Sequence, residues 1–382
     1  MMVKMSRREL ALSAAAFKQA PTTPPYRGAL DKFEGGLDMK TFDPVAWSRM
    51  RYQEMPRQLR FTARNAAEAQ AWQKKLRPKV ASLLGGFPSK RPPIQARILE
   101  TRDFPAYTRE AIVFESRPGL SVFAYLLKPK NASTPPPVAL CIPGHGRGVD
   151  DIVGVNDKGG DRIKKTGYQF DFAIQAVEHG MAAFAIEPLA FGCRRGAEAK
   201  KRGLGQSSCQ PSAGAAMLFG ETMIGWRVFD IMRSIDYLET RSDVDAKRIG
   251  CVGISGGGTA TLFGAAVEQR IKAVLVSGYL CTFYDCILSL AHCIDNYVPG
   301  ILQWAEMSDV AGLIAPRPFF AESGDTDDIF PVDATRQAFA ELKRVYDTLG
   351  AGDGCSHQVF SGPHEFHGKG GLPFLAKHLG AA

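Results

Sequence analysis

Several features that mark other protein classes are missing from this sequence of 382 residues. No apolar run approaches the length of a membrane-spanning helix. No Gly-Lys-Ser/Thr follows a glycine-rich turn, as a Walker-type phosphate site requires. The formal net charge is +8, but the lysines and arginines occur in short, scattered clusters and not in a stripe interleaved with aromatic residues. We therefore expect neither a membrane-spanning protein nor a nucleic-acid-binding one.

The eight cysteines also lack a recognisable pattern. There is no Cys-x-x-Cys pair, and the grouping of His292 with Cys293 does not have zinc-finger spacing, so we expect no metal site. We interpret the cysteines as mostly reduced thiols, which favours a cytoplasmic protein. Export remains open, because Ser6-Arg7-Arg8-Glu9-Leu10 and the short apolar run after it resemble a twin-arginine signal that Lys18 interrupts.

Composition divides the chain into three parts. Residues 1–42 are rich in Pro, Gly and Ala and have no sustained period, which is typical of a leader or arm. Residues 43–93 are predicted to form a helical extension, with a break or kink at Pro78. Residues 94–382 are predicted to form one large α/β domain. The apolar residues of the extension recur at helical spacing: Trp72, Leu76, Val80, Leu83 and Leu84.

The pattern of the large domain begins with strands and then alternates. Residues 107–115 and 120–128 are rich in β-branched and aromatic residues, and a turn separates them, so we expect an antiparallel hairpin. Apolar strand-like runs and helical patterns alternate afterwards. We therefore expect an α/β fold with a mixed, mostly parallel sheet covered by helices on both faces. The later strands are predicted at 138–142, 181–186, 248–254, 271–276, 318–321 and 357–360, and the helices at 170–179, 224–238, 332–349 and 372–379.

Two segments interrupt the alternation, near residues 191–216 and 278–307. Each follows the carboxyl end of a predicted strand, where open α/β sheets bind ligands. We therefore expect them to form walls of a substrate pocket, with Tyr279, Tyr297 and Trp304 as substrate-binding candidates.

The sequence Gly-Ile-Ser-Gly-Gly-Gly at residues 253–258 ends a strand and begins a helix. A nucleophilic serine at such an elbow takes a strained conformation, and small neighbours let the strand and helix approach closely. Gly253 and Gly257 provide that room around Ser255 in the pattern Gly-x-Ser-x-Gly. Ser255 is therefore our candidate nucleophile.

A serine nucleophile needs a general base and a carboxylate that orients the base. In one known arrangement the three residues occur in the sequence order serine, acid, histidine, and the acid and the histidine each follow the end of a strand. The acid should lie in Gly324-Asp325-Thr326-Asp327-Asp328-Ile329-Phe330-Pro331. We favour Asp327, with Asp325 as the alternative and Asp328 as a surface or capping carboxylate. The base should lie in Gly362-Pro363-His364-Glu365-Phe366-His367-Gly368, and we favour His364 over His367.

The tetrahedral intermediate also needs two donors for its oxyanion. One should be the N–H of Gly256, directly after the nucleophile. The second should come from the loop Pro143-Gly144-His145-Gly146-Arg147-Gly148, where we favour the N–H of Arg147 and keep Gly146 as the rival. His145 then supports the site or contacts the substrate, and is not a second base.

The four segments at 253–258, 143–148, 324–331 and 362–368 together resemble the α/β-hydrolase superfamily. More narrowly, they are similar to the bacterial group related to acetyl xylan esterases and dienelactone hydrolases, over about residues 43–380. A dienelactone hydrolase would have cysteine at the position of Ser255, so the serine argues for ordinary ester hydrolysis. The resemblance implies activity on short acyl esters, including acetyl groups on sugars.

We therefore predict a serine carboxylesterase that needs no metal or organic cofactor and acts on a small-molecule or saccharide ester. A peptidase or lactonase on the same triad is the alternative among enzymes. A non-catalytic binding module of the same fold is the alternative from another class. The sequence leaves a homo-oligomer open.

Overall fold

The computed structural model describes residues 28–162 and 165–381. The arginine pair of the leader lies outside the described residues. Within those residues, no helix is both long enough and apolar enough to cross a bilayer.

The described residues form a nine-stranded mixed sheet with the spatial order β1-β2-β3-β5-β4-β6-β7-β8-β9. The pairs β1/β2, β2/β3 and β3/β5 are antiparallel, and every pair from β5/β4 to β8/β9 is parallel. The predicted hairpin and the parallel body of the sheet are both confirmed. The strands are β1 (Arg97–Asp103), β2 (Tyr107–Arg117), β3 (Leu120–Pro129), β4 (Pro137–Ile142), β5 (Ala182–Ile186), β6 (Asp245–Ile254), β7 (Ile271–Ser277), β8 (Phe319–Gly324) and β9 (Cys355–Phe360).

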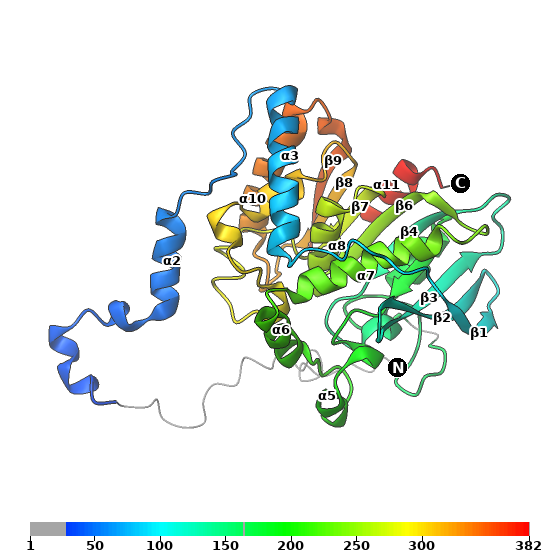
Figure 1. Ribbon diagram of the computed structural model, residues 1–382, viewed down its shortest axis with the longest axis horizontal. Coiled ribbons are helices and arrows are strands. Elements are labelled where there is room, and N and C mark those ends of the chain that lie inside the picture. Colours follow the sequence, from blue (N-terminus) through cyan, green and yellow to red (C-terminus); the bar gives the residue numbers. More distant parts are fainter. Residues whose placement is uncertain (1–27, 163–164, 382) are drawn as a thin grey trace.

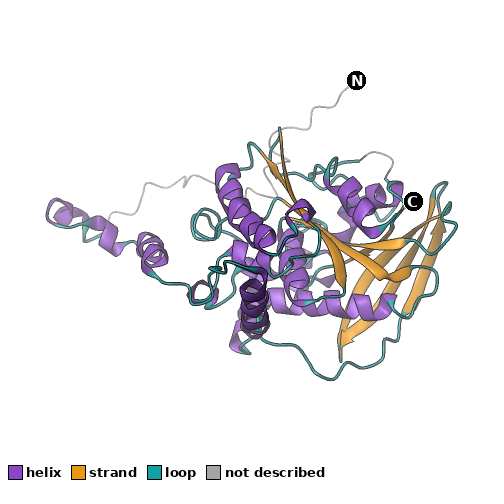
Figure 2. Cartoon of the chain, turned by 90° about the horizontal axis from the view of Figure 1, so that it is seen from above, coloured by secondary structure: helices purple, strands orange, loops and turns teal. Residues whose placement is uncertain are grey.

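Helices cover both faces of this sheet (Figures 1 and 2). One apolar core joins the sheet to α3, α7, α8, α9 and α10, and a second core on the opposite face joins it to α4 and α11. The α-helices are α2 (Pro44–Glu54), α3 (Ala66–Leu83), α4 (Phe172–Glu178), α5 (Ala197–Lys201), α6 (Cys209–Leu218), α7 (Met223–Leu238), α8 (Gly256–Val267), α9 (Met307–Gly312), α10 (Val332–Thr348) and α11 (Gly371–Leu379).

Short 3₁₀ helices lie mostly in the N-terminal arm and in the two insertions. They are η2 (Asp31–Gly36), η3 (Met39–Phe42), η4 (Gly148–Asp151), η5 (Gly192–Arg194), η6 (Ile294–Asn296), η7 (Ile301–Gln303) and η8 (Gly352–Gly354). The α/β-hydrolase architecture with an N-terminal helical extension, as predicted, is therefore present.

The central strands explain why the sequence signal was strong there. Every residue of β4 and β5 is buried, as expected for parallel strands covered on both faces. The edge strand β1 was not predicted. Its sequence Arg-Ile-Leu-Glu-Thr-Arg-Asp is almost fully exposed, so it carries no apolar alternation that could have marked it.

Of the two alternatives predicted at Pro78, a break or a kink, the break is wrong, because α3 continues through this residue. The missing N–H of Pro78 leaves the carbonyl of Lys74 without its helical partner. Both residues lie on the exposed side of the helix, where water can satisfy that carbonyl.

The helix α3 is packed firmly on the body of the molecule. Trp72, Leu76 and Val80 are buried against the core that contains α8 and α9. The side chain of Gln73 donates to the carbonyls of Gly312 (2.9 Å) and Ala315 (2.8 Å). This helix thus completes the core and is not a loosely attached cover.

Residues 28–54, which end with α2, project from the body as an arm (Figure 1). Its helix α2 is tethered by the Tyr52 hydroxyl, which donates to Glu306 Oε2 (2.5 Å), and by Arg49, which donates to the carbonyl of Ser289 (3.3 Å). Large apolar side chains of the arm are exposed: Leu30, Phe33, Leu37, Phe42, Val45, Trp47 and Met50.

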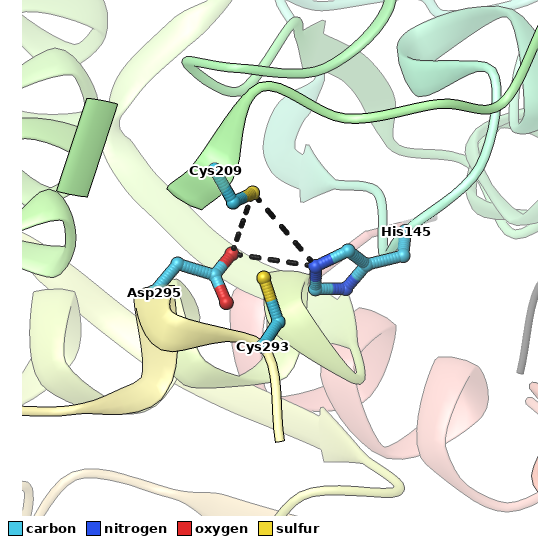
Figure 3. Close-up of side chains that lie close together, drawn as sticks. All are labelled: His145, Cys209, Cys293 and Asp295. Carbon is cyan, nitrogen blue, oxygen red and sulfur yellow. Dashed lines mark hydrogen bonds and ion pairs between the residues drawn. The ribbon is translucent and has the colours of Figure 1, made fainter. Parts of the chain in front are cut away.

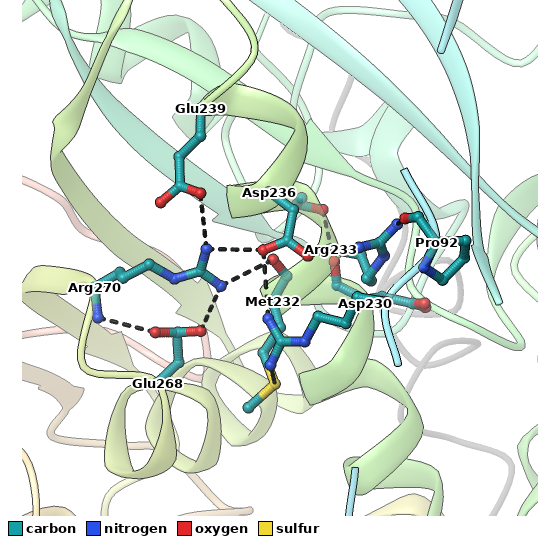
Figure 4. Close-up of polar contacts among 10 residues, drawn as sticks. Pro92, Asp230, Met232, Arg233, Asp236, Glu239, Glu268 and Arg270 are labelled. Carbon is teal, nitrogen blue, oxygen red and sulfur yellow. Dashed lines mark hydrogen bonds and ion pairs between the residues drawn. The ribbon is translucent and has the colours of Figure 1, made fainter. Parts of the chain in front are cut away.

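An ion-pair network fastens α7 to the turn between α8 and β7 (Figure 4). Arg270 contacts Asp236 (2.8 Å), Glu239 (3.1 Å) and Glu268 (2.7 Å). Arg233 contacts Asp236 (2.6 Å) from the neighbouring turn of α7. Because β7 begins directly after this turn, the network helps to fix the strand beside the elbow at residue 255.

Candidate active site

Ser255 lies between the last residue of β6 and the first residue of α8. Its backbone angles are φ 57° and ψ −124°, a conformation that non-glycine residues adopt at an energetic cost and that clusters at functional sites. The N–H of Ser255 donates to the carbonyl of Ser277 at the end of β7 (3.1 Å), which holds the turn in place. The predicted strained elbow is present.

The glycines around Ser255 are required by close backbone approach. A Cβ atom on Gly257 would collide with the carbonyl of Ile142 in β4, and one on Gly253 would collide with the carbonyl of Gly257. Larger residues would therefore push α8 away from the sheet. The Gly-x-Ser-x-Gly pattern thus allows the close approach of strand and helix that the sequence predicts.

Asp327 and His364 meet at the carboxyl ends of β8 and β9. His364 Nδ1 lies 2.7 Å from Asp327 Oδ2, and the two side chains are 12% and 1% exposed. Asp327 Oδ1 accepts the N–H groups of Ile329 (2.9 Å) and Phe330 (3.0 Å), so the carboxylate is fixed from both sides. Gly278 leaves room for the imidazole, because a Cβ there would lie 2.9 Å from His364 Cε1.

The alternatives for the acid and the base lie in other contacts. Asp325 Oδ1 accepts the N–H of Gly362 (3.0 Å) and braces the loop. The ring of His367 stacks on Phe360, with centroids 4.4 Å apart, and the backbone N–H of His367 donates to Glu322 Oε1 (3.0 Å). The structure thus pairs Asp327 with His364, and neither Asp325 nor His367 takes part in that pair.

The contact between the serine and the histidine is not formed. His364 Nε2 is buried and has no hydrogen-bond partner among the described residues. The side chain of Ser255 is instead close to Tyr168, because a Cβ on Gly144 would collide with the Tyr168 hydroxyl and lie 3.1 Å from Ser255 Cβ. Burial raises the pKa of the Tyr168 phenol, and the nearby Ser255 acts in the opposite direction. Hydrogen bonds of catalytic groups commonly tighten only when a substrate binds.

Tyr168 is a site residue that the sequence did not reveal. Its hydroxyl donates to the carbonyl of His145 (2.7 Å), and its ring stacks on His364 with centroids 5.7 Å apart. It therefore bridges the loop after β4 and the histidine. It lies in a loop before α4 that carries no motif, so no sequence signal pointed to it.

The predicted oxyanion donor at Arg147 is wrong. The N–H of Arg147 already donates to Asp151 Oδ2 (2.8 Å), and its guanidinium is held by Asp151 Oδ1 (2.8 Å). The N–H of Gly144 donates to Gln169 (2.8 Å). Within residues 28–162 and 165–381, no hydrogen bond is recorded from the N–H of His145 or Gly146, which leaves these two as candidates in the loop.

The ring of His145 covers the residue after the nucleophile. A Cβ on Gly256 would lie 3.0 Å from His145 Nδ1 and Cε1, and the ring packs against Phe191 with centroids 4.5 Å apart. His145 Nε2 points away from the elbow toward a group of polar side chains (Figure 3). Its predicted place beside the elbow fits these contacts.

The aromatic candidates of the insertion lie in different surroundings. Tyr279 is 1% exposed and packs in the core against Phe330, so the prediction of a substrate contact is wrong for this residue. Tyr297 is 38% exposed and, with Trp47, lines a groove of about 300 Å³ between α2 and the insertion. Trp304 faces α3, where Lys79 Nζ lies 4.0 Å from its ring centroid.

His292 lies close to the pair formed by His364 and Asp327. Beyond its position next to Cys293, nothing in the sequence indicated a role for it. Its ring centroid is 5.2 Å from that of Phe330, which in turn is 5.6 Å from that of His364. Burial lowers the pKa of His292 to about 4, so the ring is a neutral imidazole at physiological pH. It can therefore both donate and accept a hydrogen bond near the site.

Glu187 joins the loops that follow β4 and β5, two neighbouring strands on one side of β6. Its two carboxyl oxygens accept the N–H groups of Val149 (3.1 Å) and Cys193 (3.3 Å), and a Cβ on Gly148 or Gly192 would collide with it. Burial raises the pKa of Glu187 to about 8. The carboxyl group is thus a structural link that titrates near neutrality.

Known proteins resemble this chain in sequence and in fold. A curated protein of Bacillus subtilis (strain 168) named "Putative hydrolase YtaP" is 29% identical over 300 residues, which cover 76% of this chain and 93% of that protein. A solved structure titled as a "putative acetyl xylan esterase" from Bacteroides fragilis has a TM-score of 0.70 at 18% identity, covering 84% of this chain and 82% of its own. A glucuronoyl esterase from Solibacter usitatus has a TM-score of 0.59 at 16% identity, covering 86% and 99%.

At these identities the two solved structures establish the fold alone, and they agree with the architecture described above. The profile of the Abhydrolase family matches residues 49–344, which include α3, the elbow and the loop that contains Asp327. This match spans well over half of the chain. The chain therefore belongs to the Abhydrolase family.

Proposed function

We propose that this protein is a serine carboxylesterase in which Ser255, His364 and Asp327 form the catalytic triad. The observation that carries the proposal is the 2.7 Å contact between His364 Nδ1 and Asp327 Oδ2 at the ends of β8 and β9. The strained elbow at Ser255 lies at the end of β6 in the same parallel sheet. Side chains at the carboxyl ends of parallel strands share one edge of the sheet, where α/β proteins carry their active sites.

The proton transfer follows from the orientation of the imidazole. Asp327 accepts the hydrogen of Nδ1, so Nε2 is the free base of the neutral ring. Nε2 is buried and accepts the Ser255 proton once the hydroxyl turns from Tyr168 toward it. The serine oxygen then attacks the ester carbonyl, the alcohol leaves with a proton from His364, and water hydrolyses the acyl-enzyme by the same route in reverse.

The oxyanion of each tetrahedral intermediate is stabilised by backbone donors. We assign one donor to the N–H of Gly256, which lies at the N-terminus of α8 and has no partner within the helix. We assign the other to the loop after β4, at His145 or Gly146, because Asp151 occupies the N–H of Arg147. Removing such a donor costs about 10²–10³-fold in kcat in serine hydrolases.

For the substrate we propose an ester of a carbohydrate, with a short acyl group such as acetyl. Solved structures with this fold include proteins whose titles name acetyl xylan esterase, glucuronoyl esterase and methylesterase activities. The neutral imidazole of His292 near Phe330 and His364 suits this proposal, because sugar hydroxyls need partners that both donate and accept.

The catalytic part of the proposal is tested with Ser255→Ala and the matched control Ser361→Ala, an exposed serine in the loop before His364. Ser255→Ala should lose hydrolysis of p-nitrophenyl acetate and labelling by a fluorophosphonate probe, and Ser361→Ala should keep both. Unchanged hydrolysis by a folded Ser255→Ala variant would falsify the mechanism. Absence of an adduct on the unmutated protein would favour the non-catalytic binding module.

The substrate part is tested with a panel of acetylated sugars, a glucuronate methyl ester, p-nitrophenyl esters of increasing acyl length, lactones and peptide amides. We expect the highest kcat/KM for acetylated sugars. Comparable turnover of amides or lactones would replace the esterase with the peptidase or lactonase alternative. A preference for the glucuronate ester would support the triad but would mean that the sugar supplies the acyl part of the ester and not the alcohol.

A further inference from the structure

Four side chains that could bind a metal ion lie close together beside the elbow (Figure 3). They come from the loop after β4 and from the two insertions. His145 comes from the loop after β4, Cys209 from the first turn of α6, and Cys293 and Asp295 from the segment around η6. Their nearest nitrogen, sulfur and oxygen atoms all lie within 4.8 Å of one another. These segments are far apart in the sequence, so only the fold brings them together.

The spacing of the donor atoms fits tetrahedral coordination. Zinc bonds of about 2.3 Å to sulfur and about 2.0–2.1 Å to nitrogen or oxygen place neighbouring donors roughly 3.3–3.8 Å apart in a tetrahedron, the sulfur–sulfur pair being the widest. His145 Nε2 and Asp295 Oδ2 are 3.5 Å apart, and Cys209 Sγ lies 3.4 Å from Asp295 Oδ2 and 3.9 Å from His145 Nε2. The pairs that include Cys293 Sγ lie within 4.8 Å, so this thiol would move by up to about 1 Å to complete the tetrahedron.

The charges around the cluster also balance when a divalent ion is present. Two thiolates and the carboxylate of Asp295 carry three negative charges, and the ion together with Arg227 carries three positive ones. Arg227 is buried and contacts both Asp295 Oδ2 and Cys209 Sγ, the second at 3.5 Å. Hydrogen-bond donors behind the ligands are a regular feature of metal sites, because they orient the ligands and tune their basicity.

We propose that His145, Cys209, Cys293 and Asp295 bind one zinc ion as a closed structural site. A donor set of two sulfurs, one nitrogen and one oxygen in a tetrahedron suits zinc and not the oxygen-seeking magnesium or calcium ions. The four protein ligands leave no open position for a substrate, so the ion organises the pocket wall and does not activate water.

The ion would have a defined effect on the elbow. It joins the loop after β4 to α6 and to η6, which belong to the two insertions beside the candidate site. When Nε2 of His145 bonds the metal, the hydrogen of the neutral ring must be on Nδ1. Nδ1 is the ring nitrogen close to Gly256. The tautomer and the position of this ring, which touches the residue after the nucleophile, would then depend on the metal.

The site can be loaded in the folded protein. The side chain of His145 is 27% exposed and Cys293 is partly exposed, whereas Asp295 is 1% exposed and Cys209 is buried. The cluster therefore has an open side toward solvent and a buried side held by Arg227, which supplies the entry path that a metal site needs.

The test measures metal binding to the full-length reduced protein and needs no enzyme assay. Stripped protein is titrated with Zn²⁺, and bound metal is counted after removal of excess ion. A parallel sample is loaded with Co²⁺, whose intense visible bands and thiolate charge-transfer absorption report a tetrahedral sulfur-containing site. The variants are Cys209→Ser and Cys293→Ser, and the control is Cys193→Ser, an exposed cysteine in the same insertion.

We expect one zinc ion per chain, a higher Tm with zinc than with chelator, and a tetrahedral cobalt spectrum. Each ligand variant should weaken zinc binding by at least about 100-fold, whereas Cys193→Ser should bind like the unmutated protein. Zinc binding that Cys209→Ser and Cys293→Ser leave unchanged would overturn the proposal. So would an octahedral cobalt spectrum of the unmutated protein, a result that decides the matter even where a variant does not fold.

Discussion

At the scale of single residues, the candidate site depends on which carboxylate holds the imidazole. Asp327 contacts His364 through one oxygen and two backbone N–H groups through the other, so its side chain is fixed before any substrate arrives. The sequence placed the acid in a segment with three aspartates and favoured Asp327 over Asp325. Only the fold could show that Asp325 turns to Gly362 instead.

We expect Asp327→Asn to lower kcat/KM by about 10³–10⁴-fold, the loss seen for this change in other serine triads. An asparagine can still accept the two backbone N–H groups, but its amide cannot orient the ring of His364 as the carboxylate does. The matched control Asp325→Asn keeps an acceptor for the N–H of Gly362 and should change kcat/KM little. Steady-state kinetics with p-nitrophenyl acetate measure both, and equal losses in the two variants would contradict the assignment.

A second prediction at this scale concerns Glu187 and pH. Its pKa is about 8 in the folded protein against 4.5 ordinarily, so the unfolded chain releases this proton first as pH rises. The group therefore leaves stability untouched below about pH 4.5 and lowers the free energy of unfolding from there to about pH 8, by up to about 1.4 kcal/mol per pH unit.

Urea denaturation of the unmutated protein and of Glu187→Gln between about pH 5 and about pH 8 checks this prediction. The glutamine removes the titration, and any misfit of its amide against Val149 or Cys193 is a constant offset at every pH. The free-energy difference between the two proteins should therefore shift steadily in favour of Glu187→Gln as pH rises. Parallel curves would show that Glu187 is not the titrating group.

At the scale of elements, the sequence predicts best the strands that are buried on both faces and the turns that require glycine. The fully buried strands β4 and β5 appear as continuous apolar runs, and the turn into α8 appears as a glycine pattern. The strand β1 was not predictable, because its residues are almost all exposed. The continuation of α3 through Pro78 was not predictable either, because it depends on the helix packing against the body of the molecule. Tyr168 and the meeting of Cys209 with Cys293 likewise arise only from tertiary packing.

The close approach of β4, β6 and α8 leads to a prediction about two glycines of α8. In Gly257→Ala the new Cβ would collide with the backbone carbonyl of Ile142, which cannot move without shifting β4, so we expect a loss of at least about 2 kcal/mol. In Gly264→Ala it would lie 3.1 Å from Ile231 Cδ1, a side-chain end that can adjust, and alanine is the better helix former. We expect that control to stay within about 1 kcal/mol of the unmutated protein.

Urea denaturation of the two variants measures the difference, with circular dichroism to confirm that both are folded. A Gly257→Ala variant as stable as Gly264→Ala would mean that the elbow tolerates a wider separation between α8 and the sheet. The stated reason for the glycine pattern would then be wrong.

At the scale of the whole molecule, the described chain before β1 divides into two parts with different relations to the body. The arm, residues 28–54, exposes large apolar side chains. The helix α3, in contrast, buries Trp72, Leu76 and Val80 in the same core as the central strands and bonds to α8 and α9 through Arg77, which donates to the carbonyls of Ala266 (2.9 Å) and Leu313 (2.6 Å). The predicted extension, residues 43–93, thus spans both α2 of the arm and α3 of the core.

Two truncations separate these relations. Removal of residues 2–42 keeps Asp43, whose carboxylate accepts the N–H of Val45 (2.8 Å) and caps α2, so we expect a Tm within a few degrees of the full chain.

Removal of residues 2–85 uncovers the core that α3 closes. Burial of each of its large apolar side chains stabilises the fold by about 1.5–3 kcal/mol. Losing three of them approaches the 5–15 kcal/mol that stabilises a typical protein, so this truncation should be insoluble or unfolded. Differential scanning calorimetry and circular dichroism compare the two, and a folded protein lacking residues 2–85 would make α3 a removable cover rather than a wall of the core.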